Sequence, residues 1–279
     1  MADVTVIIPT YNEEQNIAAC IKSLEGFAKK IIIMDNCSTD GTKAIAESLG
    51  AKVIVSTKSY KERLNTAIEF PDIDTQWIFN IDADERLTDK SRQEFSVLME
   101  KYKDDDNVNG IVSHYYFVFM DKLLKWGFHP YKMRTFKKGT AYMENVELDE
   151  QFVLKRGRCI KMKSYIVHYD FKGMDKFINK LNGFSQRAAH DFLKVRNKEK
   201  GVSYEGLAPV HKFRRFMKYN FYYKIPIALR AQLYYVYYYY FNLGFLDGTK
   251  GKLFLFLYIY WYKFLTDGYV IEEQMEKEK

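Results

Sequence analysis

The sequence has little cysteine and no recognisable targeting segment. Its 279 residues hold three cysteines, Cys20, Cys37 and Cys159, and no two of them form a Cys-x-x-Cys pair. An odd, scattered set of thiols argues against a disulfide framework and against a zinc site, and it favours a reducing compartment. The first residues lack the basic and long apolar regions of a secretory signal, so we expect a cytoplasmic protein.

Two further features that the sequence lacks limit the classes of function that fit it. The N-terminal part has no Gly-rich phosphate loop of the kind that would favour a nucleotidyltransferase, and no internal repeat stands out. What remains is the composition of a folded protein, 47% hydrophobic and 28% charged. The formal net charge is +7 and the pI is about 9.0. This excess predicts an anionic partner, and nucleic acid, anionic lipid and a nucleotide-phosphate substrate all fit it.

The first hundred residues alternate short apolar strands with short helices. Strands are expected at 4–9, 30–34, 52–55 and 76–81, and helices at 12–25, 42–49 and 60–70. This order predicts βαβ units, whose parallel strands open their carboxyl ends onto a ligand crevice. Further strands are expected at 109–120, 132–138, 151–154 and 165–169. We therefore predict an α/β fold over residues 1–170, with a mixed, mostly parallel sheet flanked by helices.

Polar clusters follow three of the expected strands. They are Pro9-Thr10-Tyr11-Asn12-Glu13-Glu14, Asp35-Asn36-Cys37-Ser38-Thr39-Asp40-Gly41, and Asp82-Ala83-Asp84. A helix cap or an acidic turn would explain each cluster alone. Three clusters at one sheet edge instead indicate a ligand site. Strand-to-helix turns suit a nucleotide, and paired carboxylates suit a divalent cation that carries a phosphorylated substrate.

In this order, the three clusters resemble the family 2 glycosyltransferases of the GT-A fold, over roughly residues 3–170. More narrowly, the chain is similar to the lipopolysaccharide-core β-glucosyltransferase branch, through the segments 61–67, 127–136 and 244–251. The resemblance implies that a sugar moves, with inversion, from a nucleotide diphosphate donor. A UDP-sugar is favoured, and the implied acceptor is a lipid-linked or cell-surface glycan such as lipopolysaccharide or capsule.

The resemblance also implies roles for individual residues. Asp84, with Asp82, would hold Mn²⁺ or Mg²⁺, and the metal would counter the charge of the leaving diphosphate. Arg134 would lie on the acceptor side. The residues expected to bind the donor are Pro9, Thr10, Tyr11, Glu13, Asp35, Lys61, Arg63 and Asp82.

Inverting transfer also needs a base that takes the proton of the acceptor hydroxyl. The branch carries a His-Glu pair downstream of its Arg-x-Phe segment, and the matching position here reads Asp149-Glu150, without the His. We expect Glu150 to be the base, with Asp149 second and Glu147 third. Leu64 stands where the family often has an Arg, which shifts the expected phosphate contact to Arg63.

From residue 171 onward, helical spacing and aromatic residues dominate. Residues 209–224 interleave basic with aromatic side chains, and residues 225–246 are nearly uncharged and rich in Tyr. Tyr prefers the membrane interface, and Arg230 interrupts the apolar run. We therefore predict that residues 171–279 form a helical extension that attaches to the anionic inner face of the cell membrane without spanning it. A Tyr-rich bundle or a homo-oligomer interface is the alternative.

Two other functions fit parts of the sequence. A nucleotidyltransferase or another nucleotide-sugar enzyme would use the same sheet and metal. A basic nucleic-acid-binding protein would account for the high pI and for the basic-aromatic segment 211–224. The second alternative leaves the three strand-end clusters unexplained, so we expect no nucleic-acid partner.

Overall fold

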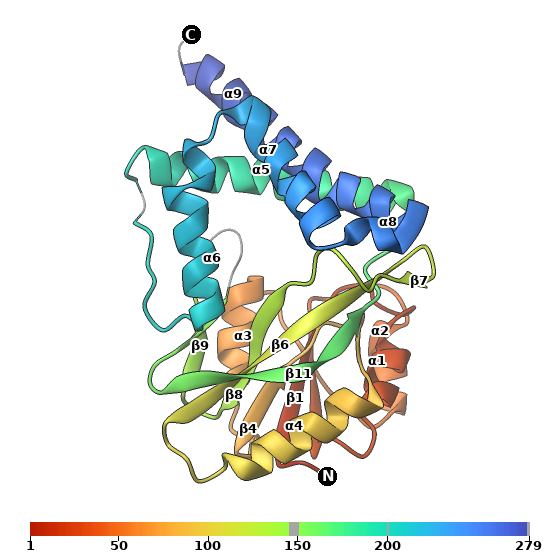
Figure 1. Ribbon diagram of the computed structural model, residues 1–279. Helices are drawn as coiled ribbons and strands as arrows, with labels where there is room; N and C mark the ends of the chain where they lie inside the picture. Colours follow the sequence, from red (N-terminus) through yellow and green to blue (C-terminus); the bar gives the residue numbers. More distant parts are fainter. Residues whose placement is uncertain (145–150, 200, 278–279) are drawn as a thin grey trace.

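The computed structural model describes residues 1–144, 151–199 and 201–277, and it is built around one mixed sheet (Figure 1). The spatial order of the strands is β3-β2-β1-β4-β8-β6-β11-β5. Their bounds are β1 (Val4–Thr10), β2 (Lys30–Asp35), β3 (Lys52–Val55), β4 (Trp77–Asn80), β5 (Glu85–Leu87), β6 (Val108–Phe119), β8 (Tyr131–Lys137) and β11 (Arg158–His168). A two-residue strand, β7 (Lys122–Leu123), pairs with β6, and β9 (Ala141–Met143) pairs with β10 (Phe152–Leu154) in a small second sheet.

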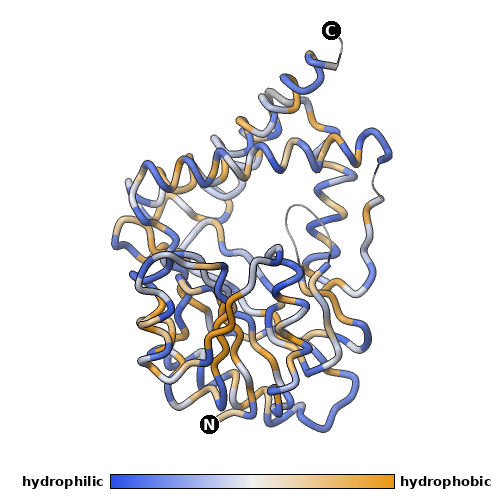
Figure 2. The backbone as a smooth tube through the Cα atoms, turned by 180° about the vertical axis from the view of Figure 1, so that it is seen from behind, coloured by the Kyte–Doolittle hydropathy of each residue, from blue (hydrophilic) through white to orange (hydrophobic). Residues whose placement is uncertain are grey.

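The strands β3, β2, β1 and β4 are parallel neighbours, and helices cover both of their faces. Alternate residues of β1 point to opposite sides, as the pleat of a strand requires. Val6 packs with α1 (Ile17–Ser23), α2 (Thr42–Ser48) and α4 (Asp89–Lys101), whereas Ile7 packs with α3 (Tyr60–Ile68). Figure 2 shows the hydrophobic residues concentrated in these central strands. The predicted βαβ alternation is confirmed.

The other half of the sheet brings distant strand ends to one place. β8 is antiparallel to β4 and to β6, β11 is parallel to β6, and β5 is antiparallel to β11. The register pairs His168 with Glu85, so the residues just before β5 and just after β11 are neighbours. Asp84 and Asp170 therefore meet across 86 positions of sequence.

A layer of helices lies above the carboxyl edge of the sheet in Figure 1. Its helices are α5 (Met174–Arg196), α6 (Pro209–Asn220), α7 (Ile227–Val236), α8 (Gly248–Leu255) and α9 (Tyr262–Lys277), with short 3₁₀ or π turns η1 (Tyr222–Lys224), η2 (Tyr237–Phe241), η3 (Gly244–Asp247) and η4 (Phe256–Trp261). Buried aromatic residues join this layer to the sheet. Phe119 of β6 lies 5.4 Å from Phe177 and 5.5 Å from Phe254, between ring centroids.

A second joint ties the turn η3 to the loop after β7. The carboxylate of Asp247, which is buried, accepts hydrogen bonds from the backbone N–H of Lys125 (3.1 Å) and of Trp126 (2.8 Å). A Cβ on Gly127 would lie 3.4 Å from the Cα of Gly244, so the two backbones approach closely. Two of the three segments that suggested the narrower family branch, 127–136 and 244–251, are therefore in direct contact.

Three sequence predictions differ from the structure in detail. The helix expected at 12–25 begins only at Ile17, because Asn12 has φ +54° and cannot continue a helix. The strand expected at 165–169 is the end of the longer β11. The apolar run 225–246 is broken, since α7 ends at Val236 and Leu243 has φ +56°. Within the described residues, none of the helices combines the length and the apolar character that a membrane crossing requires.

Candidate functional site

Two of the predicted strand-end clusters meet at a buried carboxylate. Asp35 ends β2 and is 1% exposed. Its Oδ1 accepts a hydrogen bond from the Thr10 hydroxyl at 2.8 Å, and its Oδ2 accepts one from the backbone N–H of Ser38, also at 2.8 Å. These hydrogen bonds compensate the burial of the charge and fix the carboxylate at the sheet edge.

The loops after β1 and β2 are fastened to each other as well. The backbone N–H of Asn12 donates to the Ser38 hydroxyl at 2.9 Å, and the Asn12 side-chain oxygen accepts from the Thr39 backbone N–H at 2.9 Å. The backbone N–H of Glu13 donates to the Thr42 hydroxyl at 2.7 Å. Residues expected to form a helix are thus used to build the edge of the site.

Arg63, on α3, is buried close to this edge without a full set of partners. It is 6% exposed, and its Nε and Nη1 atoms have no hydrogen-bond partner among the described residues. Burial lowers its pKa, and the nearby groups of Tyr60, Asp35 and Cys37 act in the opposite direction. Guanidinium groups stay protonated even so. A buried cation with unused donors is a candidate for binding an anion.

Asp82 lies in a network of buried charges. Its Oδ2 is 2.7 Å from Arg134 Nη1, and the same guanidinium nitrogen is 3.3 Å from Oε2 of the fully buried Glu85. Lys132 Nζ is 3.0 Å from Oε1 of Glu85. Burial would raise the pKa of Asp82, but the cations of Arg134 and Lys132 outweigh it and hold the pKa below its ordinary value. The network fixes the turn between β4 and β5.

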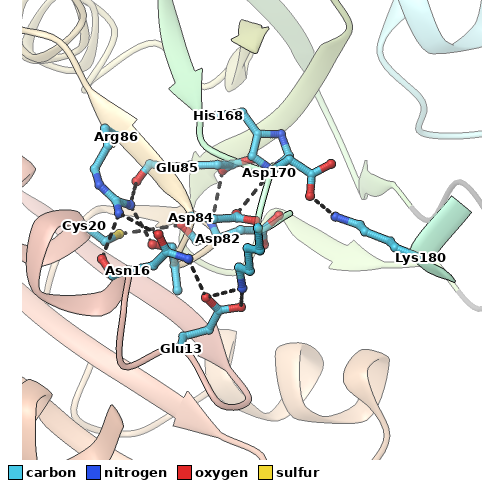
Figure 3. A network of polar contacts seen from close by, with 12 residues as sticks. Glu13, Asn16, Cys20, Asp82, Asp84, Glu85, Arg86, His168, Asp170 and Lys180 are labelled. Carbon is cyan, nitrogen blue, oxygen red and sulfur yellow. Dashed lines mark hydrogen bonds and ion pairs between the residues drawn. The ribbon is translucent and has the colours of Figure 1, made fainter. Parts of the chain in front are cut away.

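Asp84 faces a different set of groups (Figure 3). Its Oδ1 is 3.3 Å from His168 Nε2, and the ligand atoms of Asp84, His168 and Asp170 lie within 4.8 Å of one another. Burial would lower the pKa of His168, but the Asp84 carboxylate outweighs it and the pKa is raised. The His168 Nδ1 atom is buried and has no partner among the described residues. Two carboxylates and an imidazole fit a divalent cation such as Mn²⁺ or Mg²⁺.

Two lysines, one from the segment between β11 and α5 and one from α5, complete the site. Lys172 Nζ lies 2.6 Å and 2.7 Å from the two carboxylate oxygens of Glu13. Lys180 forms an ion pair with Asp170, as Figure 3 shows. Burial would lower the pKa of Lys180, but Asp170 and Asp84 outweigh it and the pKa is raised. The Lys180 ammonium therefore remains charged next to the carboxylate of Asp170.

The structure brings together part of the predicted set. Thr10 with Asp35, Asp82 with Arg134, and Asp84 lie at the same edge, with Glu13 held by Lys172. Pro9 is half-buried at the end of β1, Tyr11 is exposed, and Lys61 is half-buried on α3. Asp82 as a metal ligand and Arg134 as an acceptor-side residue stay predictions. Glu150, Asp149 and Glu147 lie outside the described residues.

Sequence reasoning missed four residues of the site: His168, Asp170, Lys172 and Lys180. A signal was present, since the strand expected at 165–169 ends in His168-Tyr169-Asp170, which is a fourth polar cluster after a strand. This cluster could not be assigned to the site from the sequence, because the order of strands in the sheet cannot be read from their order in the chain. Only the pairing of β11 with β5 brings this cluster to Asp84.

Several known proteins are similar to this chain in sequence. The sequence profile described as glycosyl transferase family 2 matches residues 5–174. An uncharacterized glycosyltransferase of Rickettsia typhi is 27% identical over 222 residues, which is 70% of this chain and 69% of that protein. The lipopolysaccharide core biosynthesis glycosyltransferase LpsC of Rhizobium meliloti is 40% identical over 89 residues, or 30% of this chain and 32% of that protein.

A solved structure also matches part of this chain. A crystal structure of glucosyl-3-phosphoglycerate synthase from Mycobacterium tuberculosis, in complex with Mn²⁺, uridine diphosphate and glucosyl-3-phosphoglycerate, is 22% identical to the chain. The match covers 40% of this chain and 43% of the other, with a TM-score of 0.33.

Proposed function

This chain belongs to glycosyl transferase family 2, and from that premise we propose that it moves a sugar from a nucleotide diphosphate donor, a UDP-sugar above all, to a lipid-linked or cell-surface glycan. The observation that carries the proposal is the sheet edge, where the buried carboxylate of Asp35 ends one strand and the side chains of Asp84, His168 and Asp170, which could hold a metal ion, lie at or next to the ends of others. Lipopolysaccharide is the favoured acceptor because LpsC, with which this chain shares 89 aligned residues, is named for lipopolysaccharide core biosynthesis.

The nucleoside would bind at Thr10 and Asp35. Asp35 can accept hydrogen bonds from a base or a ribose, and Arg63 has unused N–H donors for anionic or carbonyl oxygens. Pro9, Tyr11 and Glu13, which follow or end β1, would border the same ligand. Lys61 would add positive charge from α3.

Asp84, His168 and Asp170 would hold a divalent cation, Mn²⁺ or Mg²⁺. When bound, such a cation counters the charge that develops on the leaving diphosphate. The role of Asp82 is set by Arg134, which neutralises it and anchors the turn that presents Asp84. Asp82 would therefore face the ribose and the metal region from a fixed position. Arg134 would lie on the acceptor side of this turn.

We propose inversion at the anomeric carbon, with Glu150 as the base and Asp149 as the next candidate. Replacing Glu150 with Gln keeps the shape and removes the basicity, so the rate should fall about 10²–10⁴-fold with little change in donor affinity. If the Glu150→Gln variant is fully active and the Asp149→Asn variant is not, Asp149 is the base.

We also propose that the helical layer attaches the enzyme to the anionic inner face of the membrane. The support is an apolar stripe on α7 and η2 whose exposed side chains recur every three or four residues: Leu229, Leu233, Val236, Tyr237, Tyr240 and Phe241. Residues 209–252 contain eight Lys and Arg residues and one acidic residue, Asp247. Arg215 pairs with Glu144, and Arg230 is buried against Asp267, so the other six basic residues are the ones available to a surface. Exposed apolar area flanked by positive charge matches an anionic lipid surface.

A binding assay based on the melting temperature tests the donor function. Nucleotide diphosphate sugars with uridine, guanosine or thymidine are added with and without Mn²⁺, and the melting temperature is followed. A donor that binds only the folded state raises the melting temperature in a concentration-dependent way. We expect the largest shift with a UDP-sugar and Mn²⁺ together. A protein that no nucleotide sugar stabilises, with or without Mn²⁺, would contradict the proposal.

A further inference from the structure

The cation-binding group already contains a positive charge supplied by the protein itself. Lys180 of α5 pairs with Asp170, which is one of the three groups that could hold a metal ion. We propose that Lys180 is a donor-binding residue that holds Asp170 while the site is empty and turns to the diphosphate of the donor when a divalent cation takes Asp170. This inference rests on the proposed function, and it concerns a residue outside the span matched by the family profile, 5–174.

The surroundings of Lys180 allow such a movement. Its helix is anchored, because Phe177 and Leu181 on either side of it are buried in the aromatic cluster beneath α5. The Lys180 side chain is nevertheless 37% exposed, whereas the carboxylate-bearing side chain of Asp170 is 5% exposed. A fixed backbone with a flexible four-carbon side chain lets the ammonium move while its origin stays in place.

Electrostatics gives the movement its direction. A divalent cation at Asp84, His168 and Asp170 repels the neighbouring ammonium and competes with it for the Asp170 carboxylate. The diphosphate of a donor brings new negative charge to the same place. The ammonium then gains a charge-assisted hydrogen bond to phosphate oxygen, which replaces the one that it loses.

A purely structural ion pair makes the opposite prediction. If Lys180 only ties α5 to the end of β11, its removal would loosen Asp170 and weaken the binding of the metal. If Lys180 competes with the metal, its removal would strengthen metal binding in the absence of nucleotide. The sign of the change in Mn²⁺ affinity therefore separates the two roles without any turnover being measured.

The test uses the whole chain with Lys180 replaced by Met, which keeps the aliphatic length and removes the charge. Lys176→Met is the matched control, since Lys176 is exposed on the same helix. The affinity for Mn²⁺ alone is measured from the signal of free Mn²⁺ in electron paramagnetic resonance. The affinity for UDP, and for GDP in parallel, is measured by calorimetry at saturating Mn²⁺.

We expect Lys180→Met to bind Mn²⁺ about threefold to tenfold more tightly and to bind UDP about tenfold more weakly, since one charged hydrogen bond is lost. Lys180→Arg, which restores a cation, should recover most of the UDP affinity, and Lys176→Met should match the wild type in both assays. Weaker or unchanged Mn²⁺ binding by Lys180→Met, or unchanged UDP binding, overturns the inference. A wild type that binds Mn²⁺ but neither nucleotide refutes the donor function, and this role with it.

Discussion

At the carboxyl edge of the sheet, the groups without partners are polar and buried, whereas on α7 and η2 they are apolar and exposed. Arg63 is 6% exposed, and two of its N–H-bearing nitrogens have no partner in the described part of the chain, whereas Phe241 is 75% exposed. Each arrangement is costly for an isolated protein, the first in desolvation and the second in contact with water. We propose a different partner for each arrangement, an anionic ligand at the edge and, for the exposed apolar side chains, the membrane surface proposed above.

The largest effect is expected from the removal of Asp84, which tests whether the polar edge of the sheet binds a metal. Asp84→Ala should lower turnover on the order of 10³-fold, because a metal contributes several kcal/mol of charge stabilisation in the transition state. The melting temperature should fall by only a few degrees, since the lost ion pair with His168 contributes on the order of 1 kcal/mol. Asp104→Ala, at an exposed position, is the control in the same assays. Full activity in Asp84→Ala, or wild-type activity that survives EDTA, would remove the metal from the site.

Substitutions in the apolar stripe test whether it binds a membrane surface. Replacing both Leu233 and Phe241 with Glu should weaken binding to anionic vesicles about 10²-fold, because each lost apolar side chain contributes on the order of 1.5–3 kcal/mol when fully buried. Val97→Glu is the control, since Val97 is 64% exposed on α4, away from the helical layer. Sedimentation with vesicles gives the affinities, and raised salt should weaken the wild type. A wild type that never binds vesicles, but dissociates from dimer to monomer when the stripe is changed, would favour the oligomer.

Replacing Arg63 should change ligand affinity and protein stability in opposite directions. Arg63→Met should lower UDP affinity about tenfold, through the loss of a charged donor. It should also raise the free energy of unfolding of the ligand-free protein by about 1–3 kcal/mol, since a buried group without full hydrogen bonding is removed. Urea unfolding and calorimetry measure the two quantities. A destabilised variant would show that the guanidinium has a stabilising partner within the protein.

The smallest expected effect concerns pH. The pKa of His168 is raised above its ordinary 6.5 in the folded protein, because the attraction of Asp84 outweighs burial. A group with a raised folded pKa contributes stability below its unfolded pKa and loses that contribution as the pH rises through the folded pKa. In EDTA, wild type should therefore exceed His168→Gln by on the order of 1 kcal/mol at pH 6, and the difference should shrink toward pH 9. A difference that grows with pH would contradict the charged pair.

Much of the catalytic half could be predicted because its signals are local. Buried strands show as apolar runs, and polar residues at their ends show where ligands meet a parallel sheet, so Thr10, Asp35 and Asp84 were found from the sequence. The helix expected from Asn12 failed because hydrogen bonds with Ser38 and Thr39 outweighed the helical pattern. His168 and Asp170 could not be placed beside Asp84 because their position depends on the pairing of β11 with β5, strands that are far apart in the sequence and whose pairing no local pattern encodes. Lys180 depends on the same pairing, because it joins this group through its ion pair with Asp170.

The hydrogen bonds to Asp247 have a consequence for the order of events during synthesis. The ribosome makes the loop at Lys125 and Trp126 well before the carboxylate that accepts its two N–H groups. The growing chain can therefore assemble its sheet early, while this loop still waits for a partner. Lys180 also emerges only after the whole of β11. We expect the protein to acquire activity late in translation, when the helices that carry the apolar stripe have already been made. A chain that can transfer sugar then also carries the surface by which we propose that it attaches to the membrane.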